Sequence, residues 1–157
     1  MASITQGNCT LNIKVQAYHY VEETQTDEWY YAASITYLNQ PLFYTPIHPY
    51  HCDDLTEAID FELHDSRLSD TLQTALTTQC GQSMDMTWEG GFDLDISPPT
   101  ADQQNWSVKI TIGSLFFGSV TPEHLSFSLD FFAPQAEWQR FSDELQQEED
   151  YRKNHPL

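Results

Sequence analysis

The feature that most constrains the fold is a strand-like stretch that runs directly into a helix-like stretch at residues 125–147. In its first part, apolar residues alternate with polar ones, a period of two that is typical of a strand with one buried face: Leu125, Phe127, Leu129 and Phe131. After Pro134, which suits the first turn of a helix, apolar residues recur at spacings of three and four: Trp138, Phe141 and Leu145. Such a helix buries its apolar stripe by folding back onto a sheet, so the rest of the chain is expected to supply that sheet.

Alternation elsewhere predicts further strands. They are residues 9–21, 29–38, 57–64, 84–88, 92–96 and 106–112. Three prolines make residues 41–54 an edge strand or an ordered loop. A helix from Asp54 competes with the strand at 57–64, and a first helix is expected from Asp65 or Ser66 to just before Gly81.

These patterns predict the α+β class: a mostly antiparallel sheet of about six strands with two helices, the C-terminal one packed on the sheet. The length suits a single domain, which we place at residues 1–150. The polar residues from 148 onward predict that the helix gives way to a tail, frayed at 151–157. The sequence has no internal repeat.

Charge limits the choice of partner. The chain has 6 Lys plus Arg against 24 Asp plus Glu, a formal net charge of −18, and no Lys or Arg lies between Val15 and Ser66. Its carboxylates therefore must be solvated, bind metal or face a basic partner. Neutralising phosphates needs Lys and Arg, so we expect no direct nucleic-acid partner and no membrane contact.

Cysteine usage and the N-terminus indicate the compartment. Cys9, Cys52 and Cys80 are an odd number with no CxxC spacing, which favours a reducing compartment over a disulfide framework. The first residues carry no signal-peptide pattern, and no apolar stretch reaches the length of a membrane helix. We expect a soluble, cytoplasmic protein.

One grouping resembles a metal site: His48, His51 and Cys52, followed by Asp53 and Asp54. Imidazole, thiolate and carboxylate are the ligands that zinc uses. Adjacent residues such as His51 and Cys52 seldom point at one ion, so loop residues on an acidic surface are the favoured interpretation. We expect no metal and no cofactor.

Paired carboxylates occur on two predicted strands. Asp60 with Glu62, and Asp93 with Asp95, are two residues apart and share the face opposite the apolar residues. A glycosidase pair needs a cleft that raises one pKa, and nothing in the sequence supplies one. The pairs suit a solvated face or a docking surface. The sequence contains no nucleophile elbow, glycine-rich phosphate loop or HExxH motif, so we expect that the protein is not an enzyme.

Three tyrosines fall on the strand faces opposite the core stripe: Tyr18, Tyr20 and Tyr30. Tyrosine is a common interface anchor, although these rings also suit cross-strand pairs or a place beneath the second helix. The predicted partner-binding residues are Asp53, Asp54, Asp60, Glu62, Asp93, Asp95, Tyr18 and Tyr30.

Several features together resemble the immunity proteins of bacterial polymorphic-toxin systems, particularly the wall-associated-toxin (WapI-type) immunity family. They are an early hairpin with Asp27-Glu28-Trp29, a helix after the third strand, and the closing strand and helix at 127–145. The resemblance implies a non-enzymatic protein that binds and occludes a co-produced toxin.

Three functions follow from these observations. The first is an acidic cytoplasmic immunity protein or antitoxin that neutralises a basic partner, a cognate antibacterial toxin, with opposite charge speeding association. The second is a nucleic-acid mimic that inhibits a nucleic-acid-binding protein through rows of carboxylates. The third is a small metal-binding enzyme that uses the region from His48 to His64.

Overall fold

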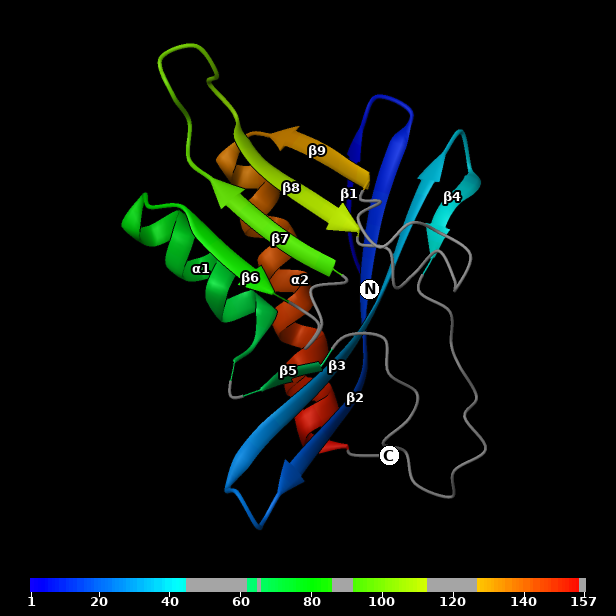
Figure 1. Cartoon of the computed structure of the whole chain (residues 1–157), viewed down its shortest axis with the longest axis vertical. Helices are drawn as coiled ribbons and strands as arrows, with labels where there is room; N and C mark the ends of the chain where they lie inside the picture. Colours follow the sequence, from blue (N-terminus) through cyan, green and yellow to red (C-terminus); the bar gives the residue numbers. More distant parts are fainter. Residues whose placement is uncertain (45–61, 65, 86–91, 113–126, 156–157) are drawn as a thin grey trace.

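The computed structural model describes residues 1–44, 62–64, 66–85, 92–112 and 127–155. In these residues the chain forms two antiparallel β-sheets and two α-helices (Figure 1). The predicted α+β class is confirmed. The prediction of one sheet of about six strands is wrong, because the described strands divide between a five-stranded and a four-stranded sheet.

The first sheet is built from the N-terminal strands. Its strands are β1 (Ala2–Gln6), β2 (Cys9–Val21), β3 (Thr26–Tyr37), β4 (Gln40–Tyr44) and β5 (Glu62–His64). They pair in the order β1-β2-β3-β4, and β5 pairs with β3. Alternation places Leu11, Ile13 and Val15 of β2 in the core. The register shifts between Val15 and Ala17, which marks a β-bulge.

The second sheet follows the first helix, α1 (Leu68–Thr78), in the chain. Its strands are β6 (Gln82–Asp85), β7 (Phe92–Ser97), β8 (Trp106–Ile112) and β9 (Phe127–Ala133), paired in that order. The second helix, α2 (Gln135–Asn154), comes after β9. The described elements thus twice run from a series of strands into a helix, although the sequence itself shows no repeat.

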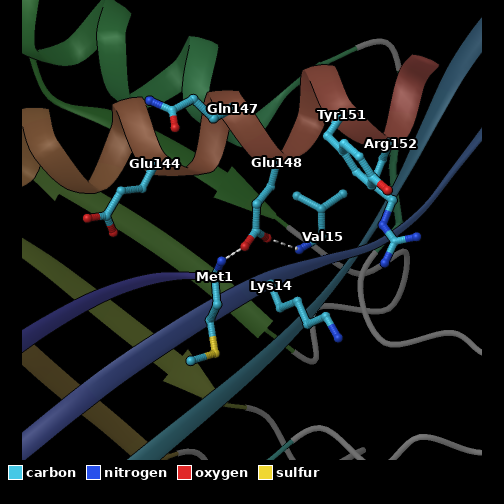
Figure 2. A pocket seen from close by; sticks show the side chains of 8 residues that line it. All are labelled: Met1, Lys14, Val15, Glu144, Gln147, Glu148, Tyr151 and Arg152. Carbon is cyan, nitrogen blue, oxygen red and sulfur yellow. Dashed lines mark hydrogen bonds and ion pairs between the residues drawn. The ribbon is translucent and has the colours of Figure 1, made fainter. Parts of the chain in front are cut away.

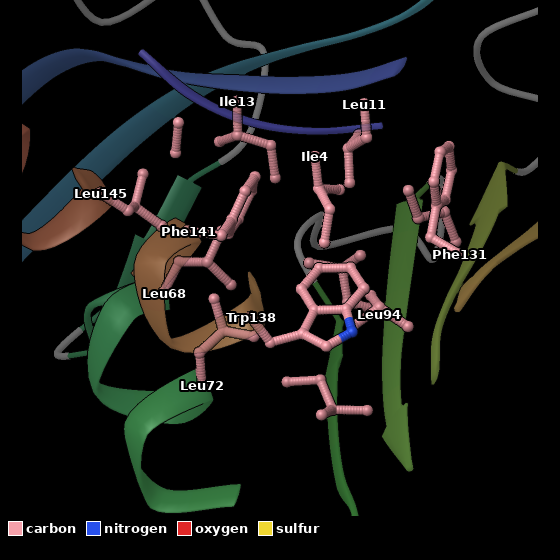
Figure 3. Close-up of a cluster of buried hydrophobic side chains, with 14 of the residues drawn as sticks. Ile4, Leu11, Ile13, Leu68, Leu72, Leu94, Phe131, Trp138, Phe141 and Leu145 are labelled. Atoms are coloured by element: carbon pink, nitrogen blue, oxygen red, sulfur yellow. The ribbon is translucent and has the colours of Figure 1, made fainter. Parts of the chain in front are cut away.

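In the part of the chain that the structure describes, one hydrophobic cluster joins the two sheets and the two helices (Figure 3). It contains the predicted stripe of α2, since Trp138, Phe141 and Leu145 are each at most 1% exposed. In Figure 1, α2 runs beside α1 and packs against β1 and β2. The prediction that the C-terminal helix packs on a sheet is confirmed.

Two segments differ from prediction. β1 was not predicted, although Ala2 and Ile4 alternate with polar residues and both are buried. The tight turn into β2 uses Gly7, whose φ of 59° suits a residue without a side chain. At the other end, α2 runs to Asn154, so the expected frayed tail is wrong for most of its length.

No helix among the described residues is both long and apolar enough to cross a membrane.

Candidate functional site

Six of the predicted metal and docking residues lie outside the described ranges: His48, His51, Cys52, Asp53, Asp54 and Asp60. Glu62 lies in β5, where its register partner is Tyr30. Within the described ranges, no group of three or more His, Cys, Asp or Glu side chains is arranged to hold a metal ion.

The two tyrosines predicted as interface anchors have structural contacts instead. Tyr30 is only 7% exposed, and its hydroxyl donates to Glu28 at 3.0 Å. Tyr18 forms a cross-strand pair with Trp29, with ring centroids 4.6 Å apart, and its hydroxyl donates to Asp27 at 2.7 Å. The prediction of an exposed anchor is wrong for Tyr30, and for Tyr18 the cross-strand alternative holds.

Asp93 and Asp95 lie on the outer face of the second sheet, opposite the buried Leu94 and Ile96. Across that face, Lys109 of β8 stands in register between Asp95 and Asp130 of β9. We call the set Asp93, Asp95 and Asp130 the acidic face. Since it holds three carboxylates around one lysine, it carries net negative charge.

The outer face of the first sheet differs from this acidic face. It is formed by β1, by the part of β2 that precedes the β-bulge and by the part of β3 paired with it, and these segments contain no carboxylate. We call it the polar face, and it consists of Ser3, Thr5, Thr10, Asn12, Lys14, Ala32, Ser34 and Thr36. Its side chains meet across strands: the hydroxyl oxygens of Thr5 and Thr10 are 2.9 Å apart, and the Asn12 amide donates to the Ser34 hydroxyl at 3.4 Å. The polar face therefore combines hydroxyl and amide groups with one cation, Lys14.

Among the described residues, three of the six Lys and Arg residues form ion pairs that involve α2. The pairs are Arg67 with Asp150 at 2.6 Å, Arg140 with Glu144 at 2.5 Å, and Lys153 with Asp27 at 2.8 Å. The hydrogen bond from Lys153 lowers the pKa of the Asp27 carboxyl below its usual value. The first of these pairs joins α2 to the start of α1 and the last joins it to the far end of the β2–β3 hairpin, whereas the Arg140–Glu144 pair lies within α2.

A pocket of about 330 Å³ lies between α2 and the edge of β2 (Figure 2). Lys14 and Arg152 both line it, and among the described residues no carboxylate pairs with either of them. In Figure 2, Glu148 lies between Glu144 on one side and the two cations on the other. Its carboxylate accepts the Val15 backbone N–H at 3.0 Å and forms an ion pair with the Met1 amine. Of the three Lys and Arg residues that form no ion pair within the described ranges, two, Lys14 and Arg152, thus line one cavity.

Near this pocket, α2 sends a buried carboxylate to the start of α1. Glu149 has no exposed surface. It accepts the Tyr31 hydroxyl at 2.8 Å, the Ser69 backbone N–H at 3.2 Å and the Ser69 hydroxyl, while the Leu68 N–H donates to the Tyr31 oxygen at 3.1 Å. Because α1 has no side-chain cap of its own at Arg67, Glu149 and Tyr31 satisfy N–H groups that its first turn leaves open.

This network makes stability depend on pH. Burial raises the pKa of the Glu149 carboxyl, against opposing hydrogen bonds from Ser69 and Tyr31. Between the ordinary carboxyl pKa and this raised pKa, the folded protein keeps a proton that the unfolded chain has released. The free energy of unfolding is therefore expected to fall as the pH rises through this window. Urea unfolding across the acidic range measures this fall, and Glu149→Gln, which cannot titrate, should lack it. Parallel curves for the two proteins would contradict the assignment.

Comparison with known proteins shows a similarity of fold to solved structures and no similarity of sequence to a known family. No model of a known protein family matches the chain, and no characterised protein matches its sequence. Among solved structures, the chain is similar to the plant transcriptional regulator PBF-2, with a TM-score of 0.50, 9% identity, and coverage of 97% of this chain and 89% of the other. WHY3 from Arabidopsis thaliana (TM-score 0.46, 12% identity, 92% and 82% coverage) and WHY1 from Arabidopsis thaliana (0.45, 12%, 92% and 79%) are less similar in structure. At this identity, the likeness to PBF-2 concerns the fold.

The likeness contradicts the main functional prediction. The prediction of an acidic immunity protein or antitoxin for a basic toxin is wrong on this finding, since a solved structure of similar fold is that of a transcriptional regulator. The expectations of a toxin partner and of no direct nucleic-acid partner are corrected with it. The resemblance to the WapI-type immunity family is a separate matter that these comparisons do not test, and it stays a prediction.

Proposed function

We propose that this chain is a non-catalytic protein that binds single-stranded nucleic acid on the polar face. The observation that carries the proposal is the absence of carboxylates from the strand segments of that face, in a chain of net charge −18. The fold shared with the plant transcriptional regulator PBF-2 supports it.

Charge density favours a single strand over a duplex. Duplex DNA carries one negative charge per about 1.7 Å of axis, and neutralising it takes many Lys and Arg residues. The polar face has only Lys14. A single strand exposes its bases and sugars, to which hydroxyl and amide side chains such as those of Asn12 and Ser34 donate and accept hydrogen bonds. Binding is therefore expected to rest on bases and sugars more than on phosphates.

A charge introduced on the polar face tests this proposal. Asn12→Asp places a carboxylate in its middle and is expected to weaken binding of a fluorescent single-stranded oligonucleotide about tenfold, the effect of about 1.4 kcal/mol. Anisotropy titrations at low salt measure the affinity. With about one phosphate contact, log K should fall against log salt with a slope of only about −0.7.

Thr111→Asp is the matched control, because it adds the same charge on the outer face of the second sheet, where Thr111 stands in register with Asp93. It should leave oligonucleotide binding close to that of the wild type. Equal weakening by both variants would show that overall charge, and not the polar face, governs binding. A wild-type protein that binds no single strand at low salt would refute the proposal.

The acidic face favours a second candidate, a nucleic-acid mimic that inhibits a nucleic-acid-binding protein. Three carboxylates on β7 and β9, the strands on either side of β8, present negative charge on a common surface. This candidate predicts no oligonucleotide binding by the chain itself. It predicts instead that a nucleic-acid-binding protein captured on the chain is released by single-stranded DNA, and is not captured by an Asp95→Asn, Asp130→Asn variant. Undiminished capture by that variant would exclude the acidic face.

A further inference from the structure

The pocket between α2 and β2 concentrates positive charge in an otherwise acidic protein. Lys14 comes from the edge of β2 and Arg152 from the last turns of α2, so strand and helix each supply one cation. Figure 2 shows their charged ends on the same side of Glu148, away from Glu144. In the described part of the chain, neither has a carboxylate partner.

The carboxylates of the same pocket already have partners. Glu144 accepts Arg140 at 2.5 Å, outside the cavity lining. One oxygen of Glu148 accepts the Val15 N–H at 3.0 Å, and the other contacts the Met1 amine. The charges left for a ligand in this cavity are therefore those of Lys14 and Arg152, and both are positive.

We infer that this pocket binds the phosphate group of a small molecule of about the size of a nucleoside monophosphate. A guanidinium matches two phosphate oxygens at once, and an ammonium adds a compact charge. Arg152 is half-buried, so water screens its charge less than that of a fully exposed side chain. A volume of about 330 Å³ falls within the range of small-molecule sites. Tyr151 adds a ring at the pocket, stacked on His155 with centroids 4.4 Å apart.

This site goes beyond the proposed function: it shares Lys14 with the polar face, but Arg152 and the other lining residues from α2 lie off that face. The phosphate that the pocket takes has two sources, a free mononucleotide or the terminal phosphate of a nucleic-acid strand. Both present the same dianionic group to Lys14 and Arg152. Comparison of adenosine monophosphate with a 5′-phosphorylated and a 5′-hydroxyl oligonucleotide separates the two sources.

The test is a titration of the full chain, first with inorganic phosphate and then with adenosine monophosphate. Binding is measured by calorimetry and by NMR. Backbone signals of Val15, Tyr151 and Arg152 are expected to shift, while that of Ser128 on the second sheet stays in place. Arg152→Gln and Lys14→Gln should each weaken adenosine monophosphate binding at least about tenfold, because each removes a charge-assisted hydrogen bond.

Lys109→Gln is the matched control, because it removes the same charge from the acidic face, outside the pocket. Its affinity for adenosine monophosphate should equal that of the wild type. Equal losses in Arg152→Gln and Lys109→Gln would overturn the inference, as would a wild-type protein that binds neither phosphate nor adenosine monophosphate.

Arg152 lies off the polar face, so its substitution separates the two proposals. If Arg152→Gln loses mononucleotide binding but keeps its affinity for the 5′-hydroxyl oligonucleotide, both proposals are supported independently. If Asn12→Asp has no effect while Arg152→Gln abolishes mononucleotide binding, only the proposed function fails.

Discussion

Replacing Trp138 by alanine is expected to lower the free energy of unfolding by about 3–5 kcal/mol, the usual cost of truncating a buried tryptophan. The side chain is 1% exposed and belongs to the cluster that joins both sheets to both helices (Figure 3). It packs edge-on against Phe141, with centroids 5.7 Å apart, and its indole N–H donates to the Trp106 carbonyl at 3.4 Å. Alanine would leave a cavity where these elements meet, and would remove the donor of that hydrogen bond.

Urea unfolding followed by circular dichroism measures the Trp138 effect. Gln146→Ala, on the exposed side of the same helix, should change stability by no more than about 0.5 kcal/mol. Trp138→Phe keeps an aromatic ring and should fall between the two. A loss below about 1 kcal/mol for Trp138→Ala, which is the average for any substitution, would show that the cluster closes without this ring.

Glu149→Ala is expected to lower the free energy of unfolding by about 3 kcal/mol, because buried donors that lose their acceptor each cost about 1–3 kcal/mol. The donors are the hydroxyl of Tyr31 and the N–H and hydroxyl of Ser69. Removing the buried charge offsets part of that cost, so the net loss is smaller than the sum over the donors. The first turn of α1 should lose protection from amide hydrogen exchange before the rest of the protein.

Glu149→Gln distinguishes lost hydrogen bonds from lost charge. Its amide oxygen can still accept from Tyr31 and from the Ser69 N–H, so it should retain more of the stability than alanine does. Equal losses for the two variants would mean that the hydrogen bonds contribute little. An unchanged exchange rate at the Ser69 amide in Glu149→Ala would contradict the capping role.

The sequence predicts local structure well where a single period dominates. The helical stripe of Trp138, Phe141 and Leu145 is buried as expected, and the strand at 9–21 has the observed bounds of β2. The face of Asp93 and Asp95 also follows from alternation alone. What alternation does not encode is which strands pair, so the division into two sheets depends on contacts distant in sequence.

Periodicity in the sequence was not sufficient to indicate the residues of the pocket and of the Glu149 network. Glu149 continues the stripe of α2, four positions after Leu145, and this spacing was the available signal. Because Glu149 is polar, the residues from 148 onward were predicted to form a tail. Its carboxylate can be buried only because Tyr31 and Ser69, which lie far away in sequence, donate hydrogen bonds to it. Likewise, Arg152 resembles any tail cation until the fold places it in the same cavity as Lys14.

The link between Glu149 and Ser69 spans 80 residues, and this separation sets an order of events during synthesis. When α1 leaves the ribosome, the group that completes its first turn has not yet been translated. The first sheet likewise lacks the helix that covers it until α2 emerges. Neither sheet is therefore expected to fold stably until α2 has been synthesised. A nascent chain stalled before residue 149 should stay sensitive to protease in both sheets.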